Sequence, residues 1–342
     1  MNAEGAVRLA LPSKGELETP TLNFLDKCGM RVSKTNPRQY LGRMSTFPEL
    51  EVIFQRPPDI FTKVRDGGAT LGVTGYDVVA EGQSDGDEVV ILYDRLGYGG
   101  CELVLAVPEG WLDVNCVADL ADLALHFRDQ GRPMRVATKY PNLVRDFLYG
   151  QGINHFALVE SQGAMEAAPA VGYADLIADI TATGTTLREN RHKQLDDGTI
   201  LRSEACLIGN RAALTHSAVM LDATRLMLEL IEAHQRGRRY QAVLANVACS
   251  EPARLAAVMR RYPAIAGLRG PAIAPIYDAN GDCVALTVSV VVREDQMREV
   301  IQQFREIGSM EIILSPVDYI FMQTSRTFDD LLARLGRSRV AP

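Results

Sequence analysis

The sequence predicts an α/β protein in which a two-lobed, doubly wound region is followed by a smaller ferredoxin-like domain. As far as the run Thr199–Ile208, apolar stretches of strand length alternate with helical stretches, and polar loops follow the strand ends. This alternation favours open sheets, which collect ligand-binding loops at the carboxyl ends of their strands. Beyond Tyr240 the order of elements becomes βαββαβ, which is the order of the split βαβ unit.

The composition bounds the class of protein. At 342 residues the chain is long enough for two or three domains, and a hydrophobic content of 47% allows a sizeable core. No apolar run reaches the roughly 18–20 residues that span a bilayer, and the first residues lack a cationic and apolar signal. We therefore expect a cytoplasmic protein without a membrane partner.

Cysteine spacing and net charge exclude further classes. The six cysteines are scattered and form no Cys-x-x-Cys pair, which argues against a zinc site and a disulfide framework. The net charge of −7 argues against a nucleic-acid partner. An anionic substrate must then be attracted by local cations or carried in with a metal.

The first strand and helix place a lysine near a potential anion site. Val7–Leu11 is apolar enough for a buried strand, and Ser13 with Glu16 forms a capping box for a helix that ends at Gly29. Lys14 then lies in the first helical turn, where a cation opposes the helix dipole unless it contacts a bound anion. A lysine that only faces solvent is an equally acceptable interpretation.

The next two strands of this region also lead into candidate binding residues. A strand ends before Arg56, whose guanidinium suits a phosphate, although an ion pair with Asp59 is the alternative. The strand Leu71–Thr74 is followed by Gly75 and Asp77. Asp77 is either a ligand-binding residue or the cap of the following helix.

The second lobe begins after a glycine-rich hinge candidate at residues 96–100. Lys139 follows the strand Arg135–Thr138 and is a further cation at a strand end. His155, a lone histidine beside an apolar strand, is interpreted as structural. The other elements expected here are the strands Cys101–Val107 and His155–Val159 and the helices over residues 119–130 and 141–150.

The stretch with the most candidate binding residues is an acidic strand followed by a threonine-rich loop. The strand Ala174–Ile180 carries Asp175 and Asp179, which point to one face at a period of two. The loop Thr183–Thr186 has Gly184 for a positive φ and offers amides and hydroxyls to an anion. Carboxylates for ribose hydroxyls or a metal, beside a phosphate-binding loop, fit a sugar phosphate. The structural alternative is a plain strand, turn and threonine-capped helix.

The rest of the chain returns to the first lobe and then enters the last domain. We expect a turn at residues 196–198, a strand over Thr199–Ile208 that makes the second crossing between lobes, and a long helix over Ala212–Gln235. The predicted domains are residues 1–98 with 199–236, residues 99–198, a ferredoxin-like domain at 237–325 and a frayed helical tail at 326–342. The last domain is expected to contain four strands near Tyr240–Ala248, Ala272–Tyr277, Cys283–Val292 and Met310–Leu314, with helices over 251–261 and 295–307 and a hairpin turn at Asn280-Gly281.

The stretch around the glycine loop resembles the signature of the ATP phosphoribosyltransferase family, which opens histidine biosynthesis. The matching residues are Glu166, Gly172, Ala174, Ile177, Asp179, Ile180, Thr183, Gly184, Thr186 and Leu187. Shorter segments resemble the same family at Arg56, Asp59 and Ile60, at Gly72, Thr74, Gly75 and Asp77, and at Ala137–Pro141. The resemblance covers essentially the whole chain and implies the two-lobed fold of type II periplasmic binding proteins with an ACT-type regulatory domain.

The resemblance also implies a reaction and a set of site residues. Adenine N1 of ATP attacks C1′ of phosphoribosyl pyrophosphate, and pyrophosphate leaves with Mg2+ as the cofactor. The residues implied in catalysis are Lys14, Arg56 and Asp179. Those implied in binding phosphoribosyl pyrophosphate are Asp179, Ala182, Thr183, Gly184, Thr185 and Thr186. Nucleotide binding is implied for Lys14, Arg56, Gly75, Asp77, Lys139 and Glu166, and metal binding for Asp175 and Asp179.

The last domain resembles the regulatory domain of the long form of the family. This implies feedback inhibition by histidine, with Leu268 and Ala272 as candidate allosteric residues, a homo-oligomer (a dimer, a hexamer or both), and no need for a separate regulatory subunit. The sequence departs from the family pattern at Ala272, where a threonine is frequent, and at Glu16, where an arginine is usual.

Two other functions are weighed against this one. A two-lobed ligand-binding or regulatory paralogue without catalytic activity would share the fold, but a pure binder does not need an anion loop together with clustered cations. A phosphoribosyltransferase of the common type, with another base as acceptor, is disfavoured because paired acidic residues immediately before the Thr-Gly loop are missing.

Overall fold

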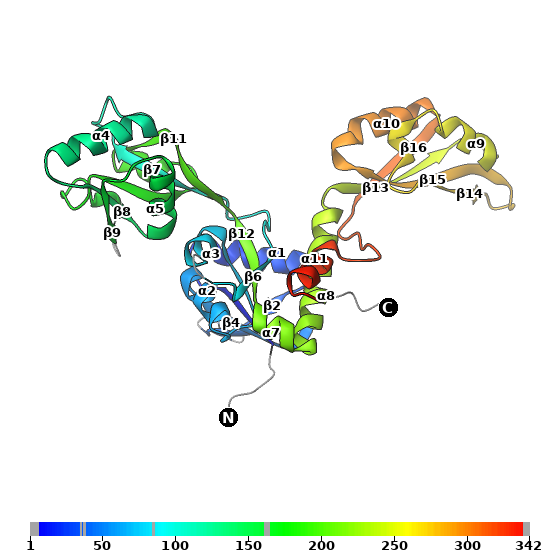
Figure 1. Ribbon diagram of the computed structural model, residues 1–342. Coiled ribbons are helices and arrows are strands. Elements are labelled where there is room, and N and C mark those ends of the chain that lie inside the picture. Colours follow the sequence, from blue (N-terminus) through cyan, green and yellow to red (C-terminus); the bar gives the residue numbers. More distant parts are fainter. Residues whose placement is uncertain (1–6, 35, 37–38, 84–85, 161–164, 338–342) are drawn as a thin grey trace. The chain divides into compact units, whose positions relative to one another are not determined.

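The computed structural model describes residues 7–34, 36, 39–83, 86–160 and 165–337 and has the predicted α/β fold class (Figure 1). The chain divides into two compact units, residues 1–224 with 331–342 and residues 225–330. The first unit contains two mixed sheets, and the second contains one antiparallel sheet. None of the helices in the described residues is long and apolar enough to cross a membrane.

A seven-stranded sheet, in the order β2-β3-β4-β1-β5-β12-β6, forms the first lobe. Its strands are β1 (Val7–Pro12), β2 (Val32–Ser33), β3 (Leu41–Met44), β4 (Phe47–Gln55), β5 (Leu71–Gly75), β6 (Val89–Tyr93) and β12 (Ala205–Asn210), and its helices are α1 (Glu18–Lys27), α2 (Pro57–Arg65), α3 (Tyr76–Gly82) and α7 (Arg211–His216). β1 lies parallel to β4 and β5, so the carboxyl ends of these three strands meet at one edge. Leu9, Ala10 and Leu11 of β1 are fully buried, as expected for a central strand covered on both faces.

A five-stranded sheet, in the order β11-β7-β10-β8-β9, forms the second lobe. Its strands are β7 (Cys101–Pro108), β8 (Met134–Thr138), β9 (Phe156–Glu160), β10 (Leu176–Thr181) and β11 (His192–Ser203), and its helices are α4 (Val117–Asp129), α5 (Pro141–Gly150), the short η1 (Met165–Ala167) and α6 (Thr185–Glu189). β8 is parallel to β9 and β10, so this sheet also collects its strand ends at one edge.

The second crossing between the lobes differs from the expectation. The predicted strand Thr199–Ile208 is two strands, because β11 pairs with β7 of the second sheet and β12 pairs with β5 of the first. The expected turn at 196–198 is instead an irregularity within β11, where the register shifts between Gln194 and Thr199. Asp197 accepts a hydrogen bond of 2.7 Å from the amide of Val117, so this residue type serves the start of α4 rather than a turn.

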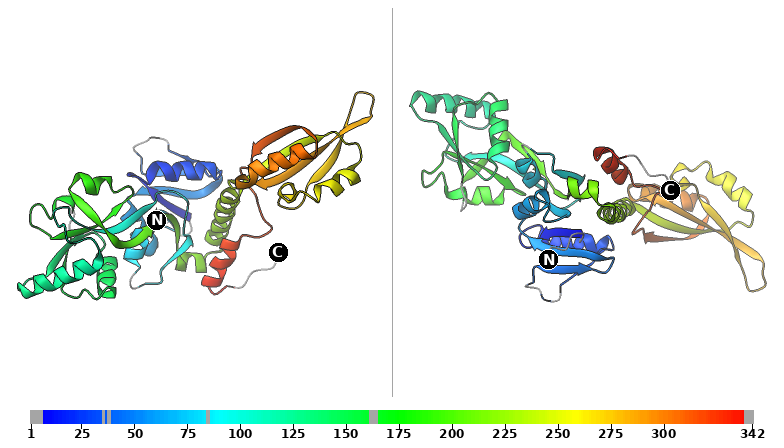
Figure 2. Two further views of the ribbon diagram at one scale, coloured as in Figure 1. Left: turned by 90° about the horizontal axis from the view of Figure 1, so that it is seen from above. Right: turned by 60° about the horizontal axis from the view of Figure 1, so that its bottom comes forward.

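The second unit has the predicted ferredoxin-like arrangement, with strand order β14-β15-β13-β16. Its elements are β13 (Tyr240–Val247), α9 (Pro252–Met259), η2 (Pro263–Ala266), β14 (Ala272–Tyr277), β15 (Cys283–Arg293), η3 (Glu294–Gln296), α10 (Met297–Glu306) and β16 (Ser309–Pro316). Both helices cover the same face of the sheet (Figure 2), where Met259 and Phe304 pack with Val243 and Val288. The hairpin expected at Asn280-Gly281 joins β14 to β15.

Two helix predictions were wrong at their boundaries. α1 begins at Glu18 and has no side-chain cap, because the amide of Ser13 donates to the carbonyl of Gln55 (2.8 Å) and Gly15 turns the chain with a φ of 79°. The single helix expected over Ala212–Gln235 breaks at Ser217 into α7 and α8 (Ala218–Gly237). The hydroxyl of Ser217 accepts a hydrogen bond of 3.3 Å from the amide of Met220, which caps α8.

Residues 326–334 also form a more regular helix than the frayed one that the sequence predicted. Residues expected to fray form α11 (Arg326–Arg334), in which Leu331 and Leu332 are buried. Within the first unit, the carbonyl of Arg334 accepts a hydrogen bond of 2.7 Å from Arg211, and its guanidinium donates one of 2.8 Å to the carbonyl of Ile91. The strand β6, which carries Ile91, was not predicted.

Candidate active site

The first sheet brings two of the predicted cations to one edge. Pro12 and Gln55 are paired residues at the ends of β1 and β4, so Lys14 and Arg56 follow neighbouring strand ends. Both side chains belong to exposed residues and make no ion pair with a carboxylate of a described residue. Among the described residues the alternative ion pair between Arg56 and Asp59 is therefore not formed. Lys14 lies in a loop before α1 and not in the first helical turn. The case for an anion beside Lys14 therefore depends on its place after the end of β1 and not on the helix dipole.

The second sheet gathers Lys139, Glu166 and Asp179. Lys139 follows the end of β8, Asp179 lies near the end of the adjacent parallel strand β10, and Glu166 is in η1. Burial raises the pKa of Asp179, the amide of Ile180 (2.9 Å) and the charge of Lys139 lower it, Glu166 raises it, and the net direction is upward. Three charged groups thus act on one another where the sequence predicted a ligand.

The glycine loop has the predicted bend. Gly184 adopts a φ of 71° and directly precedes α6. Its own amide donates to the hydroxyl of Thr181 (2.9 Å), so this donor is satisfied within the protein. The hydroxyls of Thr183 and Thr185 lie 2.8 Å apart, at hydrogen-bonding distance. No described residue accepts a hydrogen bond from the backbone amides of Thr183, Thr185 and Thr186. Three exposed backbone donors and a pair of hydroxyls remain for an anion.

A cation in this loop was missed in the sequence. The guanidinium of Arg188 donates to the carbonyl of Thr183 (3.1 Å) and to the hydroxyl of Thr185 (3.4 Å). Arg188 in α6 therefore stabilises the bend. The available signal was its spacing, because a residue four positions after Gly184 lies one helical turn away and faces back toward the loop.

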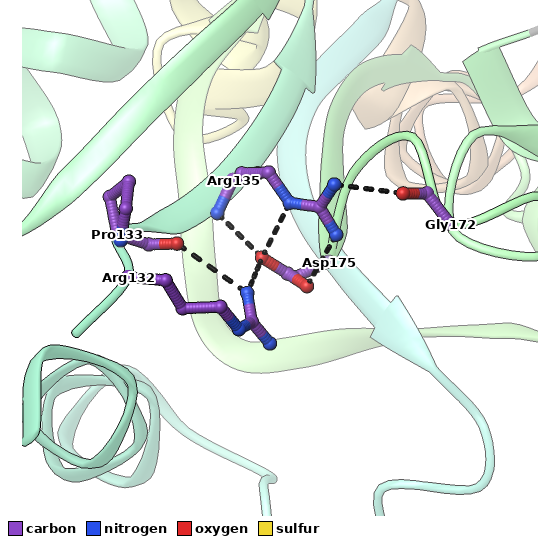
Figure 3. Close-up of polar contacts among 5 residues, drawn as sticks. All are labelled: Arg132, Pro133, Arg135, Gly172 and Asp175. Carbon is purple, nitrogen blue, oxygen red and sulfur yellow. Dashed lines mark hydrogen bonds and ion pairs between the residues drawn. The ribbon is translucent and has the colours of Figure 1, made fainter. Parts of the chain in front are cut away.

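Asp175 is held by two arginines within the protein, and its assignment as a metal ligand stays a prediction. It precedes β10 rather than lying within it, and both carboxylate oxygens are held by arginines (Figure 3). Arg132 donates at 2.8 Å, and Arg135 donates from its amide at 2.8 Å and from its guanidinium at 3.1 Å. Burial alone would raise the pKa of Asp175, but these hydrogen bonds outweigh it and the pKa is lowered. The guanidinium of Arg135 also donates to the carbonyl of Gly172 at 2.8 Å (Figure 3), which ties the preceding turn to the start of β8.

The carboxylate of Asp77 is hydrogen-bonded to other residues of the protein and does not cap α3. The residue is 5% exposed, and its carboxylate accepts hydrogen bonds from the hydroxyls of Tyr140 (2.6 Å) and Ser203 (2.7 Å). In this structure the carboxylate is shared between Tyr140 and Ser203, and the role of Asp77 in nucleotide binding stays a prediction. Gly75, the other candidate at this strand end, is the N-cap of α3.

No cluster of three or more His, Cys, Asp or Glu side chains suited to a metal occurs among the described residues. Of the two predicted metal ligands, only Asp179 keeps a carboxylate without a side-chain partner among these residues. The donor set fits a metal that arrives on a phosphate ligand better than one held by the protein alone.

Fold and site together define a two-lobed α/β enzyme that acts on phosphorylated ligands. A family model described as ATP phosphoribosyltransferase matches residues 56–233, and one described as HisG, C-terminal domain, matches residues 238–319. The chain therefore belongs to the ATP phosphoribosyltransferase family. The predicted family is confirmed, and with it the class of enzyme, a pentosyltransferase of histidine biosynthesis.

Individual relatives agree with this assignment over most of their length. ATP phosphoribosyltransferase 2, chloroplastic, of Arabidopsis thaliana is 36% identical over 334 residues, which are 96% of this chain and 81% of the relative. The ATP phosphoribosyltransferase of Bradyrhizobium diazoefficiens is 36% identical over 331 residues, which are 96% and 98% of the two chains. Among solved structures, the ATP phosphoribosyl transferase (HisG:HisZ) complex of Thermotoga maritima matches with a TM-score of 0.50 at 26% identity, covering 66% of this chain and 98% of that one.

Proposed function

We propose that the strand ends of the two lobes bind ATP and phosphoribosyl pyrophosphate and direct adenine N1 to the ribose C1′. The observation that carries the proposal is the glycine loop, whose exposed amides and hydroxyls follow directly on the strand that holds Asp179. Adenine N1 already carries a lone pair, so the reaction needs no strong base. Alignment of two anionic substrates and stabilisation of the leaving pyrophosphate are then the main tasks of the protein.

The loop Ala182–Thr186 binds the 5-phosphate of the ribose. Its support is the set of amides of Thr183, Thr185 and Thr186, together with the two threonine hydroxyls that lie 2.8 Å apart. Arg188 holds the bend and adds a positive charge beside it. Asp179, at the end of the same strand, accepts hydrogen bonds from the ribose hydroxyls.

The remaining charges belong to the pyrophosphate and to ATP. Lys14, Arg56 and Lys139 are exposed cations at strand ends, and they offset the repulsion between two highly anionic substrates. Glu166 and Gly75 border the nucleotide. Mg2+ would enter on the pyrophosphate, where it neutralises the charge that develops on the leaving group, and Asp179 is the carboxylate that can approach it.

The ferredoxin-like unit binds histidine as a feedback inhibitor in this proposal. Leu268 is 44% exposed and lies just before β14, and Ala272 is the exposed first residue of that strand. Both are therefore accessible to a ligand. Because the chain carries its own domain of this kind, it acts as a homo-oligomer without a separate regulatory subunit.

Pyrophosphate release tests the catalytic proposal. The purified chain is incubated with ATP, phosphoribosyl pyrophosphate and Mg2+, and the reactions that lack one substrate or contain EDTA serve as controls. Release that requires both substrates supports the proposal. Binding of both substrates in calorimetry without any release would instead support a non-catalytic paralogue.

A further inference from the structure

Helix α3 of the first lobe carries two acidic residues that contact the start of α5 in the second lobe. Asp77 and Glu81 are four residues apart and therefore lie on one face of α3. Asp77 accepts from the hydroxyl of Tyr140, and Glu81 accepts from two amides at the beginning of α5. We call these contacts the α3 clamp.

Glu81 supplies a helix cap that α5 lacks in its own sequence. The residue before α5, Tyr140, makes no side-chain cap. The two carboxylate oxygens of Glu81 accept from the amides of Asn142 (2.9 Å) and Leu143 (3.0 Å), and the side-chain amide of Asn142 donates to the carbonyl of Glu81 (3.2 Å). A carboxylate at this position satisfies amides that have no partner inside the helix and faces the positive end of its dipole.

Tyr140 anchors the same segment through its side chain. The residue is 8% exposed and belongs to the core of the second lobe, and its hydroxyl donates to Asp77 at 2.6 Å. Burial and the charge of Asp77 both raise the pKa of this phenol, so it stays a donor. Ser203, the last residue of β11, donates to the other oxygen of Asp77 at 2.7 Å, which adds the crossing between the lobes to the same network.

Lys139 lies between Thr138 and Tyr140, both of which make hydrogen bonds in this segment. It directly precedes Tyr140, and the amide of Tyr140 donates to the hydroxyl of Thr138 at 3.0 Å, so the backbone is fixed on both sides of the lysine. Its charge acts on the carboxylate of Asp179. We propose that Tyr140 and Glu81 are positioning residues for phosphoribosyl transfer, which act by fixing Lys139 beside Asp179; the inference rests on the proposed function.

The test compares Tyr140→Phe and Glu81→Gln with Tyr149→Phe, a matched control that removes the phenol of an exposed tyrosine in α5. We expect each clamp variant to lose about ten- to a hundredfold in kcat/KM for phosphoribosyl pyrophosphate, because small displacements of a substrate-aligning group have effects of this size. The control should match the parent. All assays are run well below the melting temperature of each variant, as measured by calorimetry.

A second measurement separates positioning from general damage. In a Lys139→Met background, Tyr140→Phe should cause little further loss, because the residue that it positions is gone. Unchanged kinetics of both clamp variants, or the full loss repeated in the Lys139→Met background, would overturn the proposal. If Tyr140→Phe does not fold, the same comparison with Glu81→Gln decides. A parent that releases no pyrophosphate counts against the proposed function itself, so the two failures are distinguishable.

Discussion

The phenol of Tyr140 donates a hydrogen bond of 2.6 Å to the carboxylate of Asp77, and both groups are buried. The two residues lie 63 positions apart, and each is two residues past the end of a strand, β5 for Asp77 and β8 for Tyr140. Both belong to short segments that resemble the family in the sequence, Gly72–Asp77 and Ala137–Pro141. The structure shows that these two segments contact each other and thereby join the two lobes.

Gly184→Val should impair binding of phosphoribosyl pyrophosphate. A left-handed residue with a side chain is strained by about 1–2 kcal/mol, and the new Cβ would lie 3.2 Å from the guanidinium of Arg188. We expect kcat/KM for phosphoribosyl pyrophosphate to fall by at least about tenfold, in line with a change of this size in free energy. Gly152→Val is the control, since Gly152 has a φ of 76° and nothing within 4 Å of the new Cβ. Turnover of the folded Gly184→Val protein close to that of the parent would mean that the loop assignment is wrong.

Arg188→Gln should raise KM for phosphoribosyl pyrophosphate more than it lowers kcat. The variant loses a charge beside the loop and the hydrogen bonds to Thr183 and Thr185, so the anion site is less well ordered. Hydrogen bonds that involve a charged group contribute about 1.5–3 kcal/mol, which corresponds to at least about a tenfold change in KM. Arg128→Gln, which removes a surface arginine paired with Asp129, should leave the kinetics unchanged. Equal KM values for the two variants would remove Arg188 from the site.

Asp179→Asn should abolish most activity and stabilise the protein. Burial raises the folded-state pKa of Asp179, so ionisation of this carboxyl is disfavoured in the folded protein. The resulting destabilisation is absent below the unfolded pKa of about 3.9 and is complete above the folded pKa. Calorimetry should therefore show a higher melting temperature for Asp179→Asn at pH 7, and the difference should vanish below about pH 4. A lower melting temperature at pH 7 would contradict this account.

Asp175→Asn should have the opposite effect on stability and a smaller effect on activity. The hydrogen bonds from Arg135 and Arg132 outweigh burial and lower the pKa of this carboxyl, so its contribution is present above the unfolded pKa and is lost as the pH falls through the folded pKa. Urea denaturation at pH 7 should show a loss of roughly 1–3 kcal/mol in the free energy of unfolding. Asp129→Asn, in an exposed ion pair, serves as the control. A loss that stays the same at pH 3 would contradict the ion-pair explanation.

Ala272→Thr should make the enzyme more sensitive to histidine. The threonine adds a hydroxyl at an exposed position of β14. A hydrogen bond to a bound ligand would lower the inhibition constant by a few-fold, in line with a net contribution of about 0.5–1.5 kcal/mol. Ala274→Thr places the same hydroxyl two residues along the same strand and is the control. The measurement is a histidine titration of pyrophosphate release, and identical curves for the parent and Ala272→Thr would refute the prediction.

Sequence patterns were most informative where one period persisted. The strands of the ferredoxin-like unit were predicted to within a few residues, because alternation in stretches such as Cys283–Arg293 reflects one covered face of a sheet. The helical pattern over residues 212–235 predicted one helix where the structure has two. Ser217 ends the first helix and caps the second, and the apolar spacing does not show this interruption. The Asp-Asp-Gly turn signal misled for a similar reason, because Asp197 serves the start of α4 from a distant part of the chain.

The site was predicted where it depends on local backbone, and not where it depends on contacts between distant segments. Gly184 and the strand ends at Lys14, Arg56 and Lys139 follow from local order, and their functional roles stay predictions. The partners of Asp175 and Asp77 lie 40 or more positions away, so no local pattern distinguishes a carboxylate held by the protein from one that is available to a ligand.

The return of residues 331–337 to the first unit changes what kind of addition the ferredoxin-like domain is. In topology it is a domain inserted into the first unit, connected to it at both ends, rather than a terminal domain connected at one end. A chain shortened to remove this domain would therefore need an internal excision that rejoins residue 224 to residue 331. A simple stop after α8 would also discard the buried leucines of α11 and the two hydrogen bonds that connect Arg334 to Arg211 and Ile91.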